Sequence, residues 1–367
     1  MAYEGPIRVL HVVRPAAGGI RQHVIDLIRH TPPDEVRHAV AAPESFLGAL
    51  PSDLPLLSCL PLDIAESVHA VRDMKAAMQL APMARNDFEV VHAHGLRAGW
   101  VASIARKTRR FTLLCTSHNL VPVSSVSRTG LALISSQSAG MIAVSPAVQE
   151  TLRACGVPSD MIVVVPNGID FESFSSARAD MDLRAEFRDQ MQVQPRTFVV
   201  GCVARLSREK GIDILIRAAA DMPDVLFLVA GDGPERENLE LLAHPNVRLL
   251  GRLDDVRPML AGIDVFVAPS REEGQGIAVL EAMAAGVPVV ASNVGGLSHM
   301  LTDGASALLT QVGDARAIVV ALRRLQSTPE LRARVTEGAR FLAREAYDVR
   351  ETSSGVLEIY RQLCGMV

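Results

Sequence analysis

Residues 198–236, FVVGCVARLSREKGIDILIRAAADMPDVLFLVAGDGPER, decide the fold class. Two short apolar runs, Phe198–Ala204 and Val225–Ala230, flank an amphipathic segment of helical length. Continuous apolar runs of this length are typical of strands that are buried on both faces of a parallel sheet. The stretch therefore predicts a strand, a helix and a second parallel strand.

The same rhythm recurs along the chain and predicts an α/β protein. The polar stretch Asp170–Asp182 interrupts it once, and we place a linker there between two domains, as the length of 367 residues suggests. We expect two Rossmann-like, doubly wound parallel-sheet domains that face a cleft. The expected strands are Ile7–Val13, Arg37–Ala41, Leu56–Leu60, Glu89–Ala93, Phe111–Thr116, Met141–Val144 and Met161–Val165 in the first half, and Phe198–Ala204, Val225–Ala230, Val247–Leu250, Asp264–Ala268, Val287–Ala291 and the weaker Ala307–Leu309 in the second.

Composition excludes several classes of protein. The net charge of -4 argues against a protein that coats nucleic acid, so no nucleic-acid partner is expected. The 5 cysteines form no CxxC pair, which excludes a zinc knuckle or a redox motif. The N-terminal residues lack a basic signal-peptide region, and no stretch reads as a spanning helix. We therefore expect a cytoplasmic protein.

Two cations follow the strand that begins at Phe198. The strand ends near Arg205 and a helix begins near Lys210. Positive side chains beside a positive helix end suit a pyrophosphate group. The alternative is a surface pair of Arg and Lys near Glu209.

A glycine-rich loop carries two carboxylates, Glu273 on the loop and Glu281 one turn into the next helix. Such carboxylates can accept hydrogen bonds from sugar or ribose hydroxyls. The free amides of Gly276, Ile277 and Ala278 would face a phosphate.

In the first half, Gly18 and Gly19 precede a helix expected over Arg21–Arg29, so the backbone can approach a ligand there. A tight turn explains the two glycines about as well. The later motif GDGPER, 231–236, lacks the third glycine of a dinucleotide site, and we reject it as one.

Three histidines, His92, His94 and His118, follow two successive strands of the first half. The HxH pair could indicate a metal, but no third ligand at a suitable spacing accompanies it. We favour hydrogen bonding in the cleft or packing, and expect no metal site.

Six motifs together resemble, in order and spacing, those of family 4 of the retaining glycosyltransferases with the GT-B fold. They are GG at 18–19, HAH at 92–94, VPNGID at 165–170, GxxxRLxxxKGxDxLIxA at 201–218, GDGPER at 231–236 and APSxxEGxGxAVLEAMAAGVPVVASxVGG at 268–296. The resemblance covers nearly the whole chain and is looser in the first half.

The resemblance implies three domain segments: an acceptor-side domain, 1–170, a nucleotide-sugar domain, 171–347, and a C-terminal helix, 348–367, that packs back on the first domain. It implies transfer of a sugar from a nucleotide sugar, UDP-sugar before GDP-sugar, to a hydroxyl acceptor, with a lipid-linked acceptor as one alternative. Neither a cofactor nor a metal is implied.

The resemblance also implies roles for individual residues. Arg205 and Lys210 match the diphosphate clamp, Glu273 the contact to donor-sugar hydroxyls, and Glu281 the ribose ligand. His118 matches a histidine near the donor sugar, so the catalytic candidates are Arg205, Lys210, Glu273 and His118. The remaining candidates are the donor-binding Gly18, Gly19, Gly276, Ile277 and Ala278, the base-pocket Gly251, Arg252 and Leu253, and the acceptor-side His94 and Asn119.

Two positions depart from the family pattern. Gln275 stands where an aromatic residue is common, and His299 where Glu is common. Both departures bear on the choice of donor sugar.

Residues 97–110, RAGWVASIARKTRR, combine an apolar stripe (Trp100, Val101 and Ile104) with a basic end. The segment could contact an anionic membrane surface, but a helix with a buried core face and a solvated basic end gives the same pattern. Two other classes of function stay open: a nucleotide-sugar epimerase or sugar phosphorylase, and a sugar-binding module without catalytic activity.

Overall fold

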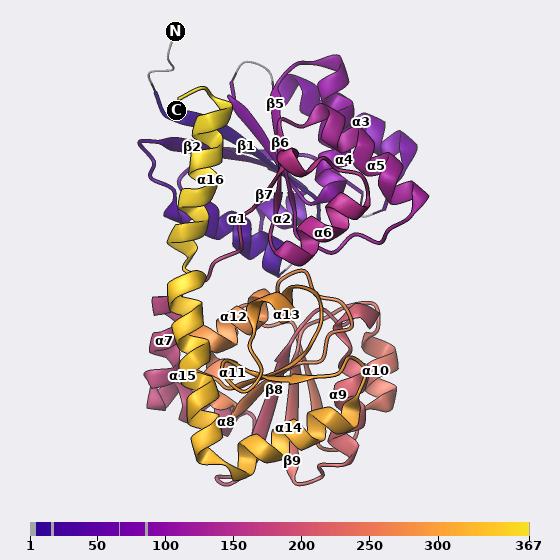
Figure 1. Cartoon of the computed structure of the whole chain (residues 1–367). Coiled ribbons are helices and arrows are strands. Elements are labelled where there is room, and N and C mark those ends of the chain that lie inside the picture. The colour runs from indigo at the N-terminus through magenta and orange to yellow at the C-terminus, as the bar shows by residue number, and fades with distance from the viewer. Residues whose placement is uncertain (1–4, 16–17, 66, 85–86, 367) are drawn as a thin grey trace. The chain divides into compact units, whose positions relative to one another are not determined.

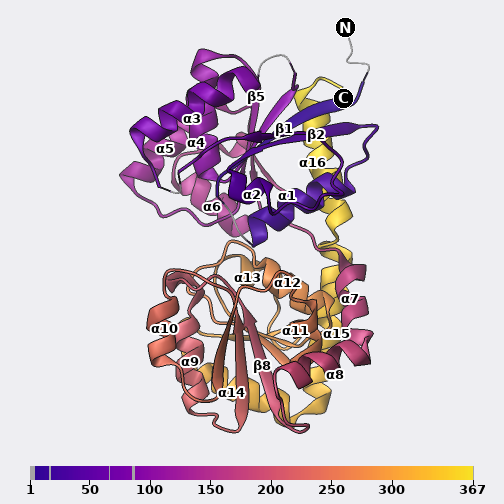
Figure 2. The same cartoon turned by 180° about the vertical axis from the view of Figure 1, so that it is seen from behind.

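The computed structural model describes residues 5–15, 18–65, 67–84 and 87–366. It divides into two compact units, unit 1 (residues 1–168 and 349–367) and unit 2 (residues 169–348). Each unit is a parallel sheet with helices on both faces (Figures 1 and 2). This confirms the expected fold class. In the described part of the chain, no helix is both long and apolar enough to cross a bilayer.

The sheet of unit 1 has the order β3-β2-β1-β4-β5-β6-β7 among the described residues. Its chain order reverses between β1 and β4, which are neighbours, so the topological switch point lies there. The strands are β1 (Ile7–Val13), β2 (Val36–Ala42), β3 (Leu56–Pro61), β4 (Val90–His94), β5 (Thr112–Ser117), β6 (Gly140–Ala143) and β7 (Ile162–Val164).

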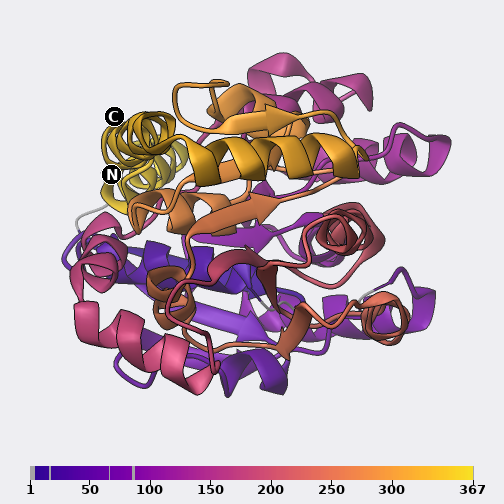
Figure 3. The ribbon, with the colours of Figure 1, turned by 90° about the horizontal axis from the view of Figure 1, so that it is seen from below.

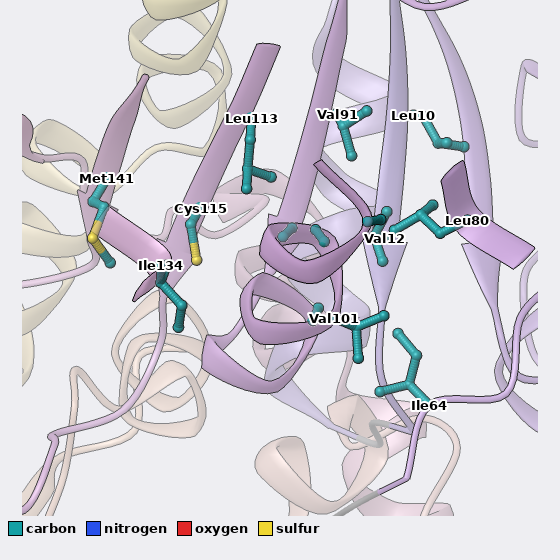
Figure 4. Packing of buried hydrophobic residues seen from close by; sticks show 14 of the residues in the cluster. Leu10, Val12, Ile64, Leu80, Val91, Val101, Leu113, Cys115, Ile134 and Met141 are labelled. Carbon is teal, nitrogen blue, oxygen red and sulfur yellow. The ribbon is translucent and has the colours of Figure 1, made fainter. Parts of the chain in front are cut away.

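Alternate residues of these strands face two separate cores. Leu10, Val12, Val91 and Leu113 pack with Val101 and the other buried side chains of one core (Figure 4). The opposite face, with Val9 and Val90, packs on helices α1 and α16. The helices of unit 1 are α1 (Gly19–His30), α2 (Glu44–Leu47), α3 (Ala70–Met83), α4 (Leu96–Thr108), α5 (Ser125–Gln137), α6 (Pro146–Ala154), the short η1 (Ser159–Met161) and α16 (Val349–Leu363).

The sheet of unit 2 has the order β10-β9-β8-β11-β12-β13, with the switch point between β8 and β11. Helices cover both faces (Figure 3). The strands are β8 (Phe198–Val203), β9 (Val225–Ala230), β10 (Val247–Gly251), β11 (Val265–Ala268), β12 (Val289–Ser292) and β13 (Leu308–Thr310). The helices are α7 (Phe171–Ala179), α8 (Met181–Gln190), η2 (Arg208–Lys210), α9 (Ile212–Ala220), α10 (Arg236–Leu242), α11 (Arg257–Gly262), α12 (Ile277–Ala284), α13 (Gly295–Met300), α14 (Ala315–Ser327) and α15 (Pro329–Ala346).

The linker expected at Asp170–Asp182 is wrong, because this stretch forms α7 and the start of α8. Asp170 and Asp180 are the helix N-caps, and the side chain of each accepts hydrogen bonds from backbone N–H groups of the first turn. Two arginines of α8, Arg184 and Arg188, pair with Asp264 before β11. These contacts make the stretch part of unit 2.

Candidate active site

The loops that follow β8 and β11 lie side by side at the switch point of unit 2. β8 and β11 are paired strands, and Arg271 donates its backbone N–H to the carbonyl of Glu209 over 2.7 Å. The Arg271 guanidinium also pairs with Asp213 over 2.7 Å. In open parallel sheets, ligands bind outside the carboxyl ends of strands at such a point.

An ion pair joins the two loops. The Lys210 ammonium lies 2.8 Å from both carboxylate oxygens of Glu273. The Ser270 hydroxyl donates to Glu273 Oε2 over 3.2 Å. Both partners are mostly buried, with 25% of the Lys210 side chain and 13% of the Glu273 side chain exposed. The two residues expected to contact the diphosphate and the sugar are therefore in direct contact.

Arg205 lies at the start of the same loop with its side chain exposed. Burial alone would raise the pKa of the nearby Glu209 carboxyl, but a hydrogen bond from Ser207 and the charges of Lys210 and Arg205 lower it. Lys210 and Arg205 thus lie close enough to the Glu209 carboxylate to stabilise its charged form.

Glycines allow these loops to touch. A Cβ atom at Gly211 would overlap the carbonyl oxygen of Pro269, and one at Gly231 would overlap that of Ala204. The two positions have φ angles of +68° and +138°, which L side chains rarely adopt. The site loops are thereby fixed relative to one another.

We expect Gly211→Ala to lower the free energy of unfolding of unit 2 by about 2–4 kcal/mol, from backbone strain and from overlap with Pro269. Gly304→Ala is the matched control, because Gly304 has φ +71° and no described atom lies within 4 Å of its Cβ position. It should cost only about 1–2 kcal/mol. Calorimetric unfolding measures both, and equal costs would contradict the tight loop contact.

The other donor-side candidates lie on neighbouring elements. Gly276 is the N-cap of α12 with φ +97°, and no side chain of the described residues caps this helix. Ile277 and Ala278 form its first turn, and Glu281 lies half-buried on the same helix. The first-turn amides of α12 follow the Glu273 loop directly.

The base-pocket candidates lie at the end of β10. Gly251 is its last residue and accepts a backbone hydrogen bond from Gly231 over 2.7 Å. Arg252 is exposed, and Leu253 packs partly on the core. Since β10 is two strands from β8, the two strands lie about 10 Å apart in the sheet.

The two departures from the family pattern lie in different surroundings. Gln275 is buried, at 4% exposure, whereas His299 on α13 is exposed.

In unit 1, the first glycine-rich loop begins α1, with Gly18 as the N-cap at φ +70° and Gly19 as the first helical residue. Gly95 has the corresponding place before α4. Both turns lie at the switch point between β1 and β4. His118 and the exposed Asn119 follow β5.

The sequence predicts no third ligand at a suitable spacing for His92 and His94, but the structure places further histidines beside them. β1 and β4 pair so that His11 lies beside His92. Four strand histidines share the face of the sheet that packs on α1 and α16, together with His118 after β5. They are His11, His38, His92 and His94, and α1 adds His23. Sequence reasoning missed His11, His23 and His38, because only the strand pairing and the packing of α1 bring them to the cluster.

Burial keeps these imidazoles neutral. It lowers the pKa of His23 and His38 to about 4, with the Asn167 side chain opposing the shift at His23. Burial, together with other histidines, lowers the pKa of the other four well below the usual range. His92 bonds the Tyr360 hydroxyl of α16 over 2.6 Å and Thr116 over 2.7 Å.

The apolar stripe of 97–110 packs on the core of unit 1. Val101 is buried, and Trp100 and Ile104 pack against the core of unit 1. Only the basic end, with Lys107, Arg109 and Arg110, is exposed.

Two family profiles match the chain. The profile described as "Glycosyltransferase Family 4" matches residues 17–173, and "Glycosyl transferases group 1" matches residues 184–341. A crystal structure of Anabaena Alr3699/HepE in complex with UDP-glucose is similar, with a TM-score of 0.86 at 22% identity over 97% of this chain and 100% of that chain. The fold and the loop site thus place the protein in the GT-B class. The chain belongs to family 4 of the glycosyltransferases.

Curated relatives match over shorter segments. The lipopolysaccharide core biosynthesis glycosyltransferase LpsE of Rhizobium meliloti is 38% identical over 144 residues, which are 38% of this chain and 42% of LpsE. The alpha-D-kanosaminyltransferase of Streptomyces kanamyceticus is 32% identical over 191 residues, 49% of each chain. The match thus spans about half the length of these relatives.

Proposed function

We propose that the protein is a retaining glycosyltransferase that moves a sugar from a nucleoside diphosphate sugar to a hydroxyl group of an acceptor. The ion pair between Lys210 and Glu273 at the switch point of unit 2 carries the proposal. A UDP-sugar is the favoured donor, supported by the fold shared with HepE, and a GDP-sugar is the next alternative. The similarity to LpsE supports an acceptor in polysaccharide or glycoconjugate synthesis, lipid-linked acceptors included.

The geometry gives the two paired residues different tasks. An ammonium group has three N–H donors, and Glu273 accepts from Lys210 through both carboxylate oxygens. A further donor can therefore bind a phosphate oxygen while the pair persists. Glu273 has lone pairs left for sugar hydroxyls. In the bound donor, Lys210 would therefore contact the phosphate and Glu273 the sugar, on the two sides of the bond that breaks.

In the reaction, the bond between the anomeric carbon and the leaving phosphate oxygen breaks. The acceptor oxygen bonds to the same face of that carbon, and its proton passes to the leaving phosphate oxygen. Lys210, Arg205 and the first amides of α12 would stabilise the negative charge that develops on the diphosphate. These groups replace a metal ion in that task. His118 is assigned a contact to the donor sugar by the family resemblance.

Calorimetric titration with UDP, GDP, ADP and TDP tests the donor site. We expect one diphosphate to bind with a millimolar or lower Kd. Lys210→Ala should weaken that binding by about 10- to 150-fold, the value of a charge-assisted hydrogen bond. Lys75→Ala on α3 removes an exposed lysine and is the control.

Hydrolysis of the matching nucleotide sugar and the anomeric configuration of the product, determined by NMR, then test the reaction. Equal affinity of the Lys210→Ala variant and the wild type would contradict the diphosphate site. Conversion of the donor into an isomeric nucleotide sugar without an added acceptor would favour the epimerase alternative, and dependence on free phosphate would favour the phosphorylase. Inversion at the anomeric carbon would contradict the same-face mechanism.

A further inference from the structure

Three buried imidazoles of unit 1 lie close together, and each has a ring nitrogen without a hydrogen-bond partner among the described residues. His23 lies on α1, His94 ends β4, and His118 follows β5. One ring nitrogen from each residue lies within 4.8 Å of those of the other two. Nε2 of His23, Nδ1 of His94 and Nε2 of His118 have no hydrogen-bond partner in the described part of the chain. Because buried polar atoms are nearly always paired, three such atoms in one cluster point to a ligand.

A second set of histidines, His11, His92 and His94, is equally close in space but has fewer nitrogens to offer. Both nitrogens of His11 are hydrogen-bonded, to His94 and His38, over 2.9 Å and 2.8 Å. Both nitrogens of His92 are bonded as well, to Tyr360 and Thr116. The hydrogen bonds therefore select the set that contains His23 and His118.

The chain of imidazoles His38, His11 and His94 supports a lone pair on His94 Nδ1. A neutral imidazole carries one N–H and one lone pair. If His94 Nε2 donates to His11 Nδ1, then His11 Nε2 donates to His38 Nδ1, and His38 holds its proton on Nε2. Each ring is then neutral and His94 Nδ1 is free to bind an ion. Hydrogen bonds of this kind orient metal-binding histidines.

We propose that His23, His94 and His118 bind one first-row transition metal ion, zinc foremost, through three imidazole nitrogens. His118 would then serve as a metal ligand and not as the donor-sugar contact that the family resemblance implies. Imidazole suits zinc, copper, iron and nickel, and three histidines with an open fourth position form a known type of zinc site. Burial keeps all three ligands neutral, as metal binding requires. Arg14 lies near His118, and its positive charge opposes a bound cation.

The test is metal binding to the full-length, chelator-treated protein, so it does not depend on sugar transfer. Zn²⁺ is titrated in competition with a chelating dye, and Co²⁺ is added as a spectroscopic probe. We expect one Zn²⁺ per chain, and visible Co²⁺ bands of a four-coordinate site. Zn²⁺ at 100 times its Kd should raise the Tm of unit 1 by roughly 5–10 °C, followed by the fluorescence of the single tryptophan, Trp100.

Variants distinguish the proposed set of ligands from the rival one. His23→Ala and His118→Ala should each weaken Zn²⁺ binding by roughly 100-fold or more. His11→Phe should weaken it by about 10- to 100-fold, because it removes the support of His94. The exposed His69 supplies the control, His69→Asn, with unchanged binding.

Circular dichroism verifies that each variant folds. If an alanine variant does not fold, His118→Asn is used in its place. Absence of stoichiometric binding to the wild type would overturn the proposal. So would binding that is lost in His92→Phe but unchanged in His23→Ala and His118→Ala, since that pattern assigns the ion to the rival set.

Discussion

Glu273→Gln is expected to lower kcat by about 10²–10³-fold, the cost of removing one charged group that acts in the transition state. Glutamine has the shape of glutamate but loses the negative charge and one acceptor oxygen. In the structure that carboxylate holds the Lys210 ammonium at 2.8 Å and faces the switch point of unit 2. The variant should therefore misplace the Lys210 ammonium. It should also weaken the hydrogen bonds to the sugar hydroxyls in the transition state, where positive charge develops on the sugar. Steady-state kinetics with the donor identified by calorimetry measures the effect.

The same variant separates the tasks of the two residues. UDP has no sugar, so its affinity should stay equal or rise, because Lys210 loses a competing partner. Lys210→Ala should instead weaken UDP binding. Glu272→Gln is the matched control from the same loop, since Glu272 is exposed and should keep wild-type kcat. Full activity of Glu273→Gln, or an equal loss in both glutamine variants, would remove Glu273 from the reaction.

The strands were predictable because each is a local apolar run that is buried on both faces. β1 and β9 have the expected bounds, and the other strands differ by one to three residues at their ends. Their order in the sheet was not predictable in the same way. β1 and β4 are neighbours although 76 residues separate Val13 from Val90, and no local pattern encodes that pairing.

Asp170–Asp182 shows where local composition misleads. Its polar residues are typical of a linker, yet they cap and solvate two helices. The contacts that hold α8, from Arg184 and Arg188 to Asp264, span about eighty residues. A stretch that depends on such distant partners is predicted poorly from its own sequence.

The candidate site was predictable on one sheet and not on the other. Lys210 and Glu273 each follow a strand in a glycine-containing loop, so their place at the carboxyl edge could be inferred singly. His11 is hidden within the apolar run Ile7–Val13 and His38 within another strand. His23 lies on a helix. Only strand register and the packing of α1 bring these side chains together.

Those histidines make unit 1 sensitive to acid. Six of them are neutral in the folded state because burial lowers their pKa, to about 4 for His23 and His38. In the unfolded chain a histidine has a pKa near 6.5, so between about pH 4 and 6.5 the unfolded state binds more protons. Stability is therefore complete above pH 6.5 and is lost as the pH falls. Unit 2 contains only His244 and His299, which are both exposed.

We expect metal-free unit 1 to unfold with a midpoint between about pH 5 and 6, while unit 2 stays folded. One pH unit below 6.5, each neutral histidine costs about 1.4 kcal/mol, and six together cost roughly 8 kcal/mol. That loss is comparable with the whole stability of a domain, which is about 5–15 kcal/mol.

Trp100 fluorescence follows unit 1, and calorimetry follows both units. His38→Met should reduce the proton uptake on unfolding by about one, whereas His69→Asn should leave it unchanged. A unit 1 that stays folded at pH 4.5 would show that the cluster accepts protons in the folded state, and would contradict the neutral network of imidazoles.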